Sequence, residues 1–215
     1  MLSKTIGIIS YLPNDANIRN KRIERLETLL DRCNLLFPNI NIVIIAQNWK
    51  TYYPKYKQHI WIAVDADKPL GITGARKALR RVFLDYCNTD YLIMLDDDCD
   101  IRGNSGEEYL KQIDDNPGCF IEFNKTLLKL FAISKELFSK VDYEDINPES
   151  EEGFEDRVFV NKLRKLFPDK KREFKNTGLT EYSISTKDPY SVWYKNQDIK
   201  KMLDNTNTII TNILN

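Results

Sequence analysis

Four short apolar runs in the first hundred residues constrain the fold of this chain more than any other feature. They are TIGIISY (5–11), INIVIIA (40–46), IWIAV (60–64) and DYLIML (90–95). Runs of this length, rich in Ile, predict strands, and a strand that is apolar on both faces is typical of a central parallel sheet covered by helices. The pattern therefore predicts an α/β protein.

Segments with helical periodicity lie between the first and second runs and between the third and fourth runs. From residue 18 to residue 36 apolar side chains recur every three or four positions, and Pro38 follows. The segment 72–87 has the same period, and Thr73 is its predicted N-cap. The resulting order predicts a Rossmann-type mixed, mostly parallel sheet with helices on both faces. In such sheets, ligands bind beyond the carboxyl ends of the strands.

The second half of the chain is more mixed. It contains predicted strands at 119–123 and 127–134, predicted helices at 134–141 and 157–167, an acidic loop at 142–156, a basic and mobile link at 168–178, and a C-terminal helix at about 196–215. No clear linker divides the chain, so we expect a single domain over residues 1–215.

Composition excludes several classes of function. Lys plus Arg equals Asp plus Glu, 32 each, so there is no bulk electrostatic case for nucleic acid or an anionic membrane. Four widely spaced cysteines without a Cys-x-x-Cys pair favour reduced thiols and a cytoplasmic location. The N-terminal apolar run is too short for a signal peptide, and no run approaches the ~20 residues that cross a bilayer.

The acidic stretch YLIMLDDDCD (91–100) points most directly to a site. Alternate residues on an extended chain point the same way, so Asp96 and Asp98 share a direction and Asp97 is opposed. Two carboxylates on one side can hold a hard divalent cation, and that cation can bridge them to a diphosphate. The alternatives are the register Asp98-x-Asp100 and a solvated loop with Asp caps.

YLIMLDDDCDI resembles the strand plus Asp-x-Asp motif of GT-A fold glycosyltransferases. LGITGARKALRRVF (70–83) resembles their Gly-x-x-x-Ala-Arg-Asn segment, with Lys77 in place of the usual Asn, and EEGFEDRVFVNKL (151–163) resembles their later Glu-Asp motif. The order and spacing of these parts agree over roughly residues 4–165. The resemblance implies a nucleotide-sugar-binding half at about 1–100, an acceptor-side half at about 101–195, and then the C-terminal helix.

The resemblance also implies roles on the donor side. Asp98 would bind the metal, Mn²⁺ or Mg²⁺, and Asp96 would face the same metal, its bound water or the ribose. Asp97 would take part in either contact. Arg76 would contact the diphosphate or nucleotide, since a guanidinium forks onto phosphate oxygens. Its alternative is a surface arginine on a basic helix.

Three further donor-side positions have a functional and a structural interpretation. Gly74 would let the backbone approach the ligand, or it is a plain turn residue. Asp15 would read the base or ribose, or it is a turn acid. Tyr11, at the end of the first strand, would stack on the base, or it is a packed aromatic.

On the acceptor side, the resemblance makes Asp156 the general base, with Glu155 as its neighbour, in an inverting reaction. The alternative is an acidic helix N-terminus that opposes the macrodipole. Many members of this group supply a further metal ligand, often a histidine. The only histidine here is His59, so Asp188 or Asp198 would substitute, or the metal would rest on the Asp motif and phosphates alone.

These observations predict a metal-dependent glycosyltransferase that moves a sugar from a nucleotide-sugar, with UDP favoured, to a hydroxyl acceptor. A sugar nucleotidyltransferase is one alternative, although SYLPNDANIRNKR (10–22) has no Gly-rich phosphate loop. A non-catalytic nucleotide-sugar-binding module is the other. A glycan or lipid-linked glycan is the favoured acceptor, while a protein side chain or a modified nucleic-acid base stays open. A homodimer through the C-terminal helix also stays open.

Overall fold

The computed structural model describes residues 1–49, 60–64, 70–97, 99, 106–123, 130–143 and 155–174. Seven strands form one sheet in the order β3-β2-β1-β4-β6-β5-β7. The strands are β1 (Lys4–Tyr11), β2 (Asn41–Gln47), β3 (Ile60–Val64), β4 (Tyr91–Asp96), β5 (Phe120–Phe123), β6 (Leu130–Ser134) and β7 (Lys171–Phe174). All neighbouring pairs are parallel except those made by β6, which runs antiparallel to β4 and β5.

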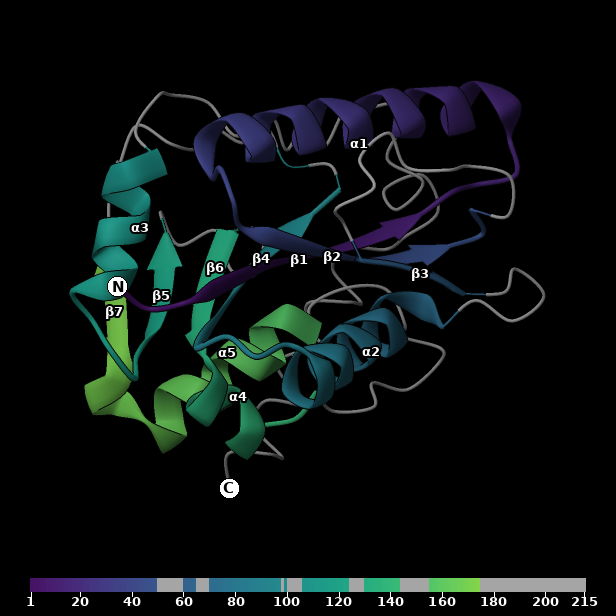
Figure 1. The fold of residues 1–215 in the computed structure, drawn as a ribbon. Coiled ribbons are helices and arrows are strands. Elements are labelled where there is room, and N and C mark those ends of the chain that lie inside the picture. Colours follow the sequence, from purple (N-terminus) through teal and green to yellow (C-terminus); the bar gives the residue numbers. More distant parts are fainter. Residues whose placement is uncertain are drawn as a thin grey trace.

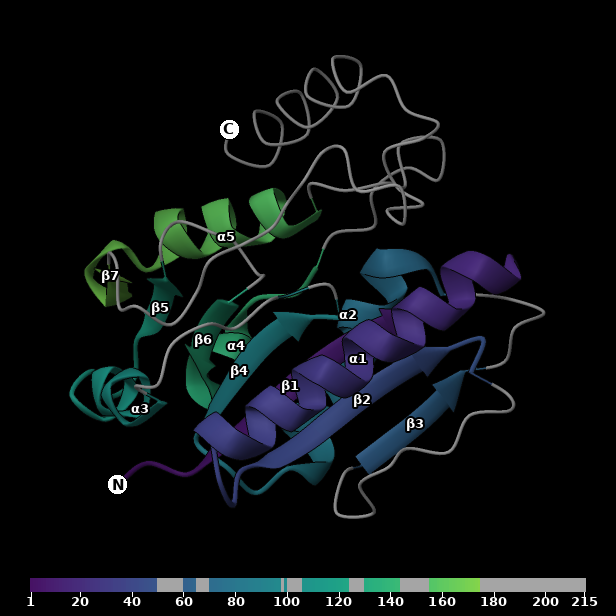
Figure 2. The same cartoon turned by 90° about the horizontal axis from the view of Figure 1, so that it is seen from above.

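Helices cover both faces of this sheet (Figures 1 and 2). They are α1 (Ala16–Leu36), α2 (Gly71–Tyr86), α3 (Gly106–Asp114), α4 (Lys135–Lys140) and α5 (Glu155–Leu166), and a 3₁₀ turn, η3 (Pro168–Lys170), leads into β7. In Figure 1, α1 lies above the sheet, while α2, α4 and α5 lie below it. The mixed α/β architecture that the apolar runs predict is therefore confirmed.

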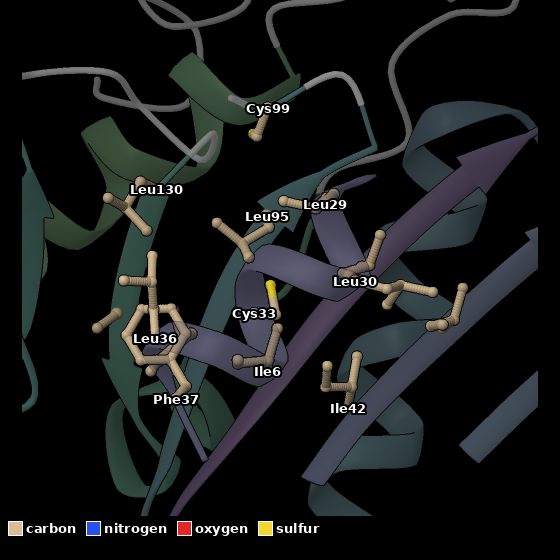
Figure 3. Close-up of a cluster of buried hydrophobic side chains, with 14 of the residues drawn as sticks. Ile6, Leu29, Leu30, Cys33, Leu36, Phe37, Ile42, Leu95, Cys99 and Leu130 are labelled. Carbon is tan, nitrogen blue, oxygen red and sulfur yellow. The ribbon is translucent and has the colours of Figure 1, made fainter. Parts of the chain in front are cut away.

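Period-two alternation within the central strands creates the two cores. In β4, Ile93 and Leu95 join a cluster with α1 and α3 (Figure 3), while Leu92 and Met94 join a second cluster with α2, α4 and α5. Gly7 in β1 lets α2 approach closely, because a Cβ there would lie 2.8–2.9 Å from side-chain carbons of its neighbours. Both faces of each central strand are therefore buried.

Several sequence predictions are wrong in detail. α2 begins at Gly71 with Leu70 at the N-cap, so Thr73 lies inside the first turn and does not cap the helix. The predicted link at 168–178 contains β7, whose Phe174 ring stacks 6.0 Å from Phe123. α3 was not predicted, since a helix of nine residues offers only two or three apolar positions to its periodicity.

α5 begins at Glu155, two residues earlier than predicted, so Glu155 and Asp156 belong to the helix and not to the preceding loop. The predicted C-terminal helix lies outside the described residues. Within the described part of the chain, no helix combines the length and apolarity needed to span a bilayer.

Candidate functional site

The carboxyl ends of four parallel strands meet at one edge of the sheet. Tyr11 of β1 pairs with Gln47 of β2, and Gln47 pairs in turn with Val64 of β3. Asp96 ends β4 opposite Ile9 of β1. This edge therefore brings the acidic stretch beside the segments that follow β1 and β2, as the position of ligand sites in such sheets predicts.

Asp96 forms an ion pair with Arg76. The Nη2 atom of Arg76 donates to Oδ1 of Asp96 at 2.9 Å, and the side chains are 4% and 19% exposed, respectively. Arg76 comes from the second turn of α2, on the face of the sheet that Leu92 and Met94 also share. The alternative of a surface arginine is therefore wrong, because Arg76 is buried against the strand end.

Asp97 points to the opposite face of the sheet. Its Oδ2 accepts a hydrogen bond from Ser10 Oγ at 2.6 Å, and its Oδ1 accepts one from Arg22 Nη1 at 2.6 Å. Ser10 belongs to β1 and Arg22 to α1. Asp97 is 6% exposed. The predicted opposition of Asp96 and Asp97 is thus observed. Asp98, the predicted metal ligand, lies outside the described residues.

The segment after β1 is held by the end of β2. Leu12 N donates to Gln47 O at 3.0 Å, and the Asn48 side chain donates to Leu12 O at 2.6 Å and to Asn14 Oδ1 at 3.0 Å. The next acid, Asp15, caps α1 by accepting from Asn17 N and Ile18 N. Asp15 is therefore the N-cap of α1, a structural role that differs from the turn acid of the alternative, and its predicted ligand contact stays a prediction.

Tyr11 is 39% exposed at the end of β1, in contrast to the buried residues that precede it. The residue is therefore partly accessible. Its predicted stacking on a base and the packed-aromatic alternative both stay predictions.

Gln47 joins the end of β2 to the start of α2. Its Oε1 accepts from Leu70 N at 2.7 Å, and its Nε2 donates to Gly71 O at 3.3 Å. Gly71 has φ +67°, a conformation that favours glycine. At Gly74 a Cβ would lie 2.8 Å from the Leu70 Cβ, so this glycine permits a tight first turn of α2. Its predicted approach to a ligand stays a prediction.

α5 places the predicted base on the same face of the sheet as Asp96. Phe159 of α5 stacks 4.3 Å from Tyr143, whose hydroxyl contacts the sulfur of Met94 at 3.6 Å. Met94 lies two residues before Asp96, and Asp156 lies one turn before Phe159. Asp156 is half-buried and its Oδ1 accepts from Arg157 N at 2.7 Å. Its role as base stays a prediction.

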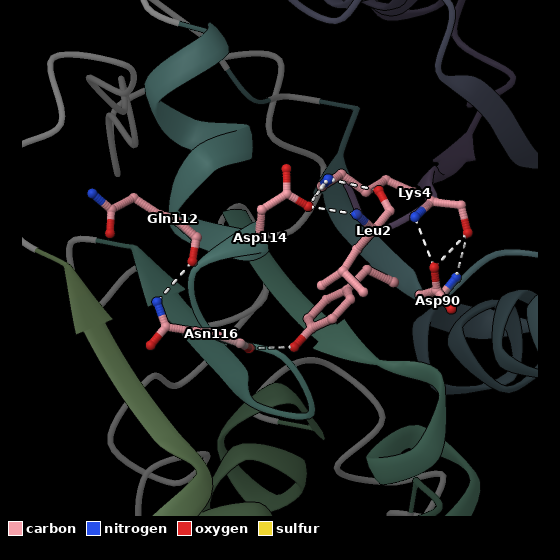
Figure 4. Close-up of polar contacts among 8 residues, drawn as sticks. Leu2, Lys4, Asp90, Gln112, Asp114 and Asn116 are labelled. Atoms are coloured by element: carbon pink, nitrogen blue, oxygen red, sulfur yellow. Dashed lines mark hydrogen bonds and ion pairs between the residues drawn. The ribbon is translucent and has the colours of Figure 1, made fainter.

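The opposite end of the sheet carries a separate polar network (Figure 4). Lys4 Nζ and Leu2 N both donate to Asp114 Oδ1 at 2.7 Å, and Ser3 donates to Asp90. A shallow hollow of about 510 Å³ lies here, lined in part by Ser3 and Asp90. It is at the amino ends of β1 and β4, away from the acidic strand end, so we do not assign the donor site to it.

The described residues supply only part of the ligand set that a divalent cation needs. The hydrogen bond and ion pair of Asp96 with described residues use its Oδ1, and the side chain is 19% exposed, so its other oxygen can supply one ligand. No group of three or more acidic, histidine or cysteine side chains gathers around a common point in the portion of the chain described. Asp98, His59, Asp188 and Asp198 lie outside it. Asp98 as a ligand stays a prediction, as does the choice of Asp188, Asp198 or the substrate phosphates for the remaining positions.

Four residues of this edge were missed by sequence reasoning: Ser10, Arg22, Gln47 and Asn48. Gln47 carries a usable signal, since it is a polar residue directly after an apolar strand, as Asp96 is. Arg22 carries no such signal in the sequence, because it is one of several basic residues on α1 and its partner, Asp97, is 75 positions away.

Comparison with known proteins identifies the fold. No family model and no curated protein matches the sequence. A fragment of S. aureus TarS, residues 1–349, matches with a TM-score of 0.57 and 12% identity over 84% of this chain and 60% of that one. A mycobacterial protein matches with a TM-score of 0.58 and 10% identity over 99% and 74%, respectively.

A third match is a protein of Desulfovibrio desulfuricans G20 that is classed as a nucleotide-diphospho-sugar transferase. It has a TM-score of 0.50 and 12% identity, over 99% of this chain and 98% of that one. At such identities the likeness shows the fold alone. The strand order, the helices on both faces and these matches lead to one conclusion: this chain has the GT-A-like fold of nucleotide-diphospho-sugar transferases.

Proposed function

We propose that this protein is a metal-dependent glycosyltransferase that uses a nucleotide-sugar, with UDP as the nucleotide. The observation that carries the proposal is the ion pair between the buried Arg76 and the partly exposed Asp96, at the carboxyl end of β4 in a GT-A-like sheet. The Asp96 side chain is 19% exposed and contacts Arg76 through Oδ1. It lies at the end of the sheet where ligands of such folds bind.

On the donor side, Asp98 and Asp96 would hold Mn²⁺ or Mg²⁺ beside the diphosphate of the nucleotide-sugar. When bound, the cation supplies Lewis-acid stabilisation of the departing diphosphate. Arg76 holds Asp96 in place and adds positive charge beside the phosphates. Tyr11, exposed at the end of β1, stacks on the base.

On the acceptor side, Asp156 removes the proton of an acceptor hydroxyl, and Glu155 assists at the start of the same helix. The acceptor oxygen then forms a bond to the anomeric carbon as the bond from that carbon to the diphosphate breaks. The products are the glycoside, with inverted configuration, and a nucleoside diphosphate. The acceptor is a glycan or lipid-linked glycan, and a protein side chain or a modified nucleic-acid base are the other candidates.

Calorimetry of UDP binding tests the donor site, with and without Mn²⁺, on the wild type and on Asp98→Ala. We expect metal-dependent binding that Asp98→Ala weakens at least tenfold. Asp114→Asn, at the other end of the sheet, is the control and should bind as the wild type does. If UDP fails, GDP, CMP and dTDP are tested in the same way, and failure of all four with metal refutes the proposal.

Product analysis separates the proposal from its alternatives. A glycosyltransferase releases a nucleoside diphosphate from a nucleotide-sugar, and Asp156→Asn should lower that turnover by about 10²–10⁴-fold while UDP affinity is kept. A sugar nucleotidyltransferase would instead release pyrophosphate from a nucleoside triphosphate and a sugar phosphate. A binding module would bind the nucleotide-sugar and leave it intact.

Two proposals concern the cellular setting. The described cysteines, Cys33, Cys87, Cys99 and Cys119, are free and buried. This state supports the proposed cytoplasmic location, where thiols stay reduced. A homodimer through the C-terminal helix also stays a prediction, and sedimentation of the full chain beside a version ending at residue 195 would test it.

A further inference from the structure

The middle aspartate of the acidic stretch is buried in a network of its own. Ser10 Oγ donates to Asp97 Oδ2 and Arg22 Nη1 donates to Asp97 Oδ1, both at 2.6 Å. The side chains of Arg22 and Asp97 are only 14% and 8% exposed. Asp97 thus joins the end of β4 to β1 and to α1, on the face opposite Asp96.

Both oxygens of Asp97 already have charged or polar partners. A ligand that used this carboxylate would have to displace a hydroxyl and a guanidinium from a site with little solvent. Removing one partner from such a pair leaves a buried charge uncompensated, which is costly. Asp97 is therefore poorly placed for the direct contact with a metal or ribose that the resemblance implied.

Asp97 lies in a turn that two hydrogen bonds between Asp96 and Cys99 close. Cys99 N donates to Asp96 O at 3.1 Å, and Asp96 N donates to Cys99 Sγ at 3.2 Å. These two bonds bracket the residue that Ser10 and Arg22 hold. Asp96 is the last residue of β4 and Asp97 is the first residue of the turn, so a fixed Asp97 side chain restricts the backbone that joins the two residues. The orientation of Asp96 therefore depends on the network around Asp97.

We propose that Ser10, Arg22 and Asp97 form an anchor that positions Asp96 and the turn after β4 for the donor site. None of the three touches the nucleotide-sugar or the metal. Ser10 and Arg22 are thus positioning residues at a site where sequence reasoning assigned no role to either. The inference rests on the proposed function for its effect on nucleotide binding, while its effect on the turn is independent of that function.

Thiol labelling measures the turn directly. Cys99 is 8% exposed and bonded to Asp96, so its reaction with an aromatic disulfide reagent, followed by peptide mapping, reports opening of the turn. Cys33 is the internal reference. It is 0% exposed and burial raises the pKa of its thiol to about 12, so it reacts only when the protein unfolds globally.

The variants are Ser10→Ala, Asp97→Asn and the control Asp114→Asn. Ser10→Ala removes one bond and keeps the ion pair, so it is the variant most certain to fold. Asp114 pairs with the 3%-exposed side chain of Lys4 at 2.7 Å, at the other end of the same β1 strand. The control therefore breaks a comparable partly buried pair without touching the turn.

We expect the ratio of Cys99 to Cys33 labelling rates to rise about tenfold in Asp97→Asn and about threefold in Ser10→Ala, with no change in Asp114→Asn. Metal-dependent UDP affinity should fall in the same order. An anchor that matters only for global stability would lower the melting temperature of Asp97→Asn and Asp114→Asn alike and leave the labelling ratio and the affinity unchanged. That result would overturn the inference.

The two proposals fail in different ways. If the wild type binds no nucleotide with metal, the proposed function fails, and the labelling ratio alone decides whether the anchor holds the turn. If the wild type binds UDP and the ratio rises while the affinity stays the same, the anchor holds the turn without positioning the site. The positioning role is then refuted.

Discussion

The Arg76–Asp96 pair permits a quantitative prediction from its burial. Arg76→Met keeps most of the aliphatic volume and leaves Asp96 as a carboxylate beside an apolar side chain. Removing one member of a fully buried pair costs roughly 3–5 kcal/mol. Because the Asp96 side chain is 19% exposed, water reaches it, and we expect about 2–3 kcal/mol of lost folding stability. In a chain of this length that lowers Tm by roughly 5–10 °C.

A double-mutant cycle isolates the pair. Arg76→Met, Asp96→Asn and the double variant are unfolded with urea, and the coupling between the two positions should be about 1.5–3 kcal/mol. Arg81→Met is the control on the same helix, since the Arg81 side chain is 82% exposed and should stay within about 0.5 kcal/mol of the wild type. Additive effects, with a coupling below about 0.5 kcal/mol, would show that the pair does not stabilise the strand end.

Three further predictions test the scaffold around the site. Asp15→Ala removes the cap of α1 and should cost about 1 kcal/mol in urea unfolding. Gly106→Ala should cost about 2 kcal/mol or more, because its Cβ would lie 1.9 Å from the Leu36 carbonyl oxygen and the backbone would have to shift. Burial acts to raise the pKa of Asp114, but the hydrogen bonds from Lys4 Nζ and Leu2 N outweigh it and lower that pKa. The carboxylate therefore stabilises the fold above its unfolded pKa of about 3.9 and loses this contribution as the pH falls through the lower native value.

Each of these predictions has a contrary outcome. Asp15→Asn retains a capping side chain, so a loss as large as that of Asp15→Ala would exclude capping as the cause. A Gly106→Ala variant with unchanged Tm would mean that α3 moves freely against the end of α1. Asp114→Asn should flatten the dependence of unfolding free energy on pH between about 5 and 3. A dependence equal to that of the wild type would contradict the lowered pKa.

Some features of the predicted site depend on residues that are neighbours in the sequence, and others depend on contacts between distant segments. The apolar run before Asp96, and the opposed directions of Asp96 and Asp97, follow from the period of an extended chain, and both are observed. The Arg76 segment was found through its resemblance, yet its burial against Asp96 was not predicted. The partner of Asp97 on α1 had no signal at all, because Arg22 differs in no visible way from the other basic residues of that helix.

The assignment of Asp15 shows how one residue type permits two interpretations. An acid beyond the first strand suits a ligand contact and equally suits a helix cap, because both use a carboxylate that accepts hydrogen bonds from N–H groups. Only the position of α1, which begins at Ala16, decides that Asp15 accepts from Asn17 N and Ile18 N. The predicted contacts of Asp98, and the roles of Glu155 and Asp156, depend on experiment.

The amino-acid sequence by itself determined the central strands, the two long helices and the acidic strand end, because periodicity and turn residues act between neighbours in the chain. Tertiary structure alone decided that β7 lies beside β5, that Gln47 holds the start of α2, and that Arg22 and Arg76 reach adjacent aspartates from opposite faces. These contacts join residues 20 or more positions apart, and they form only when the whole sheet brings the segments together.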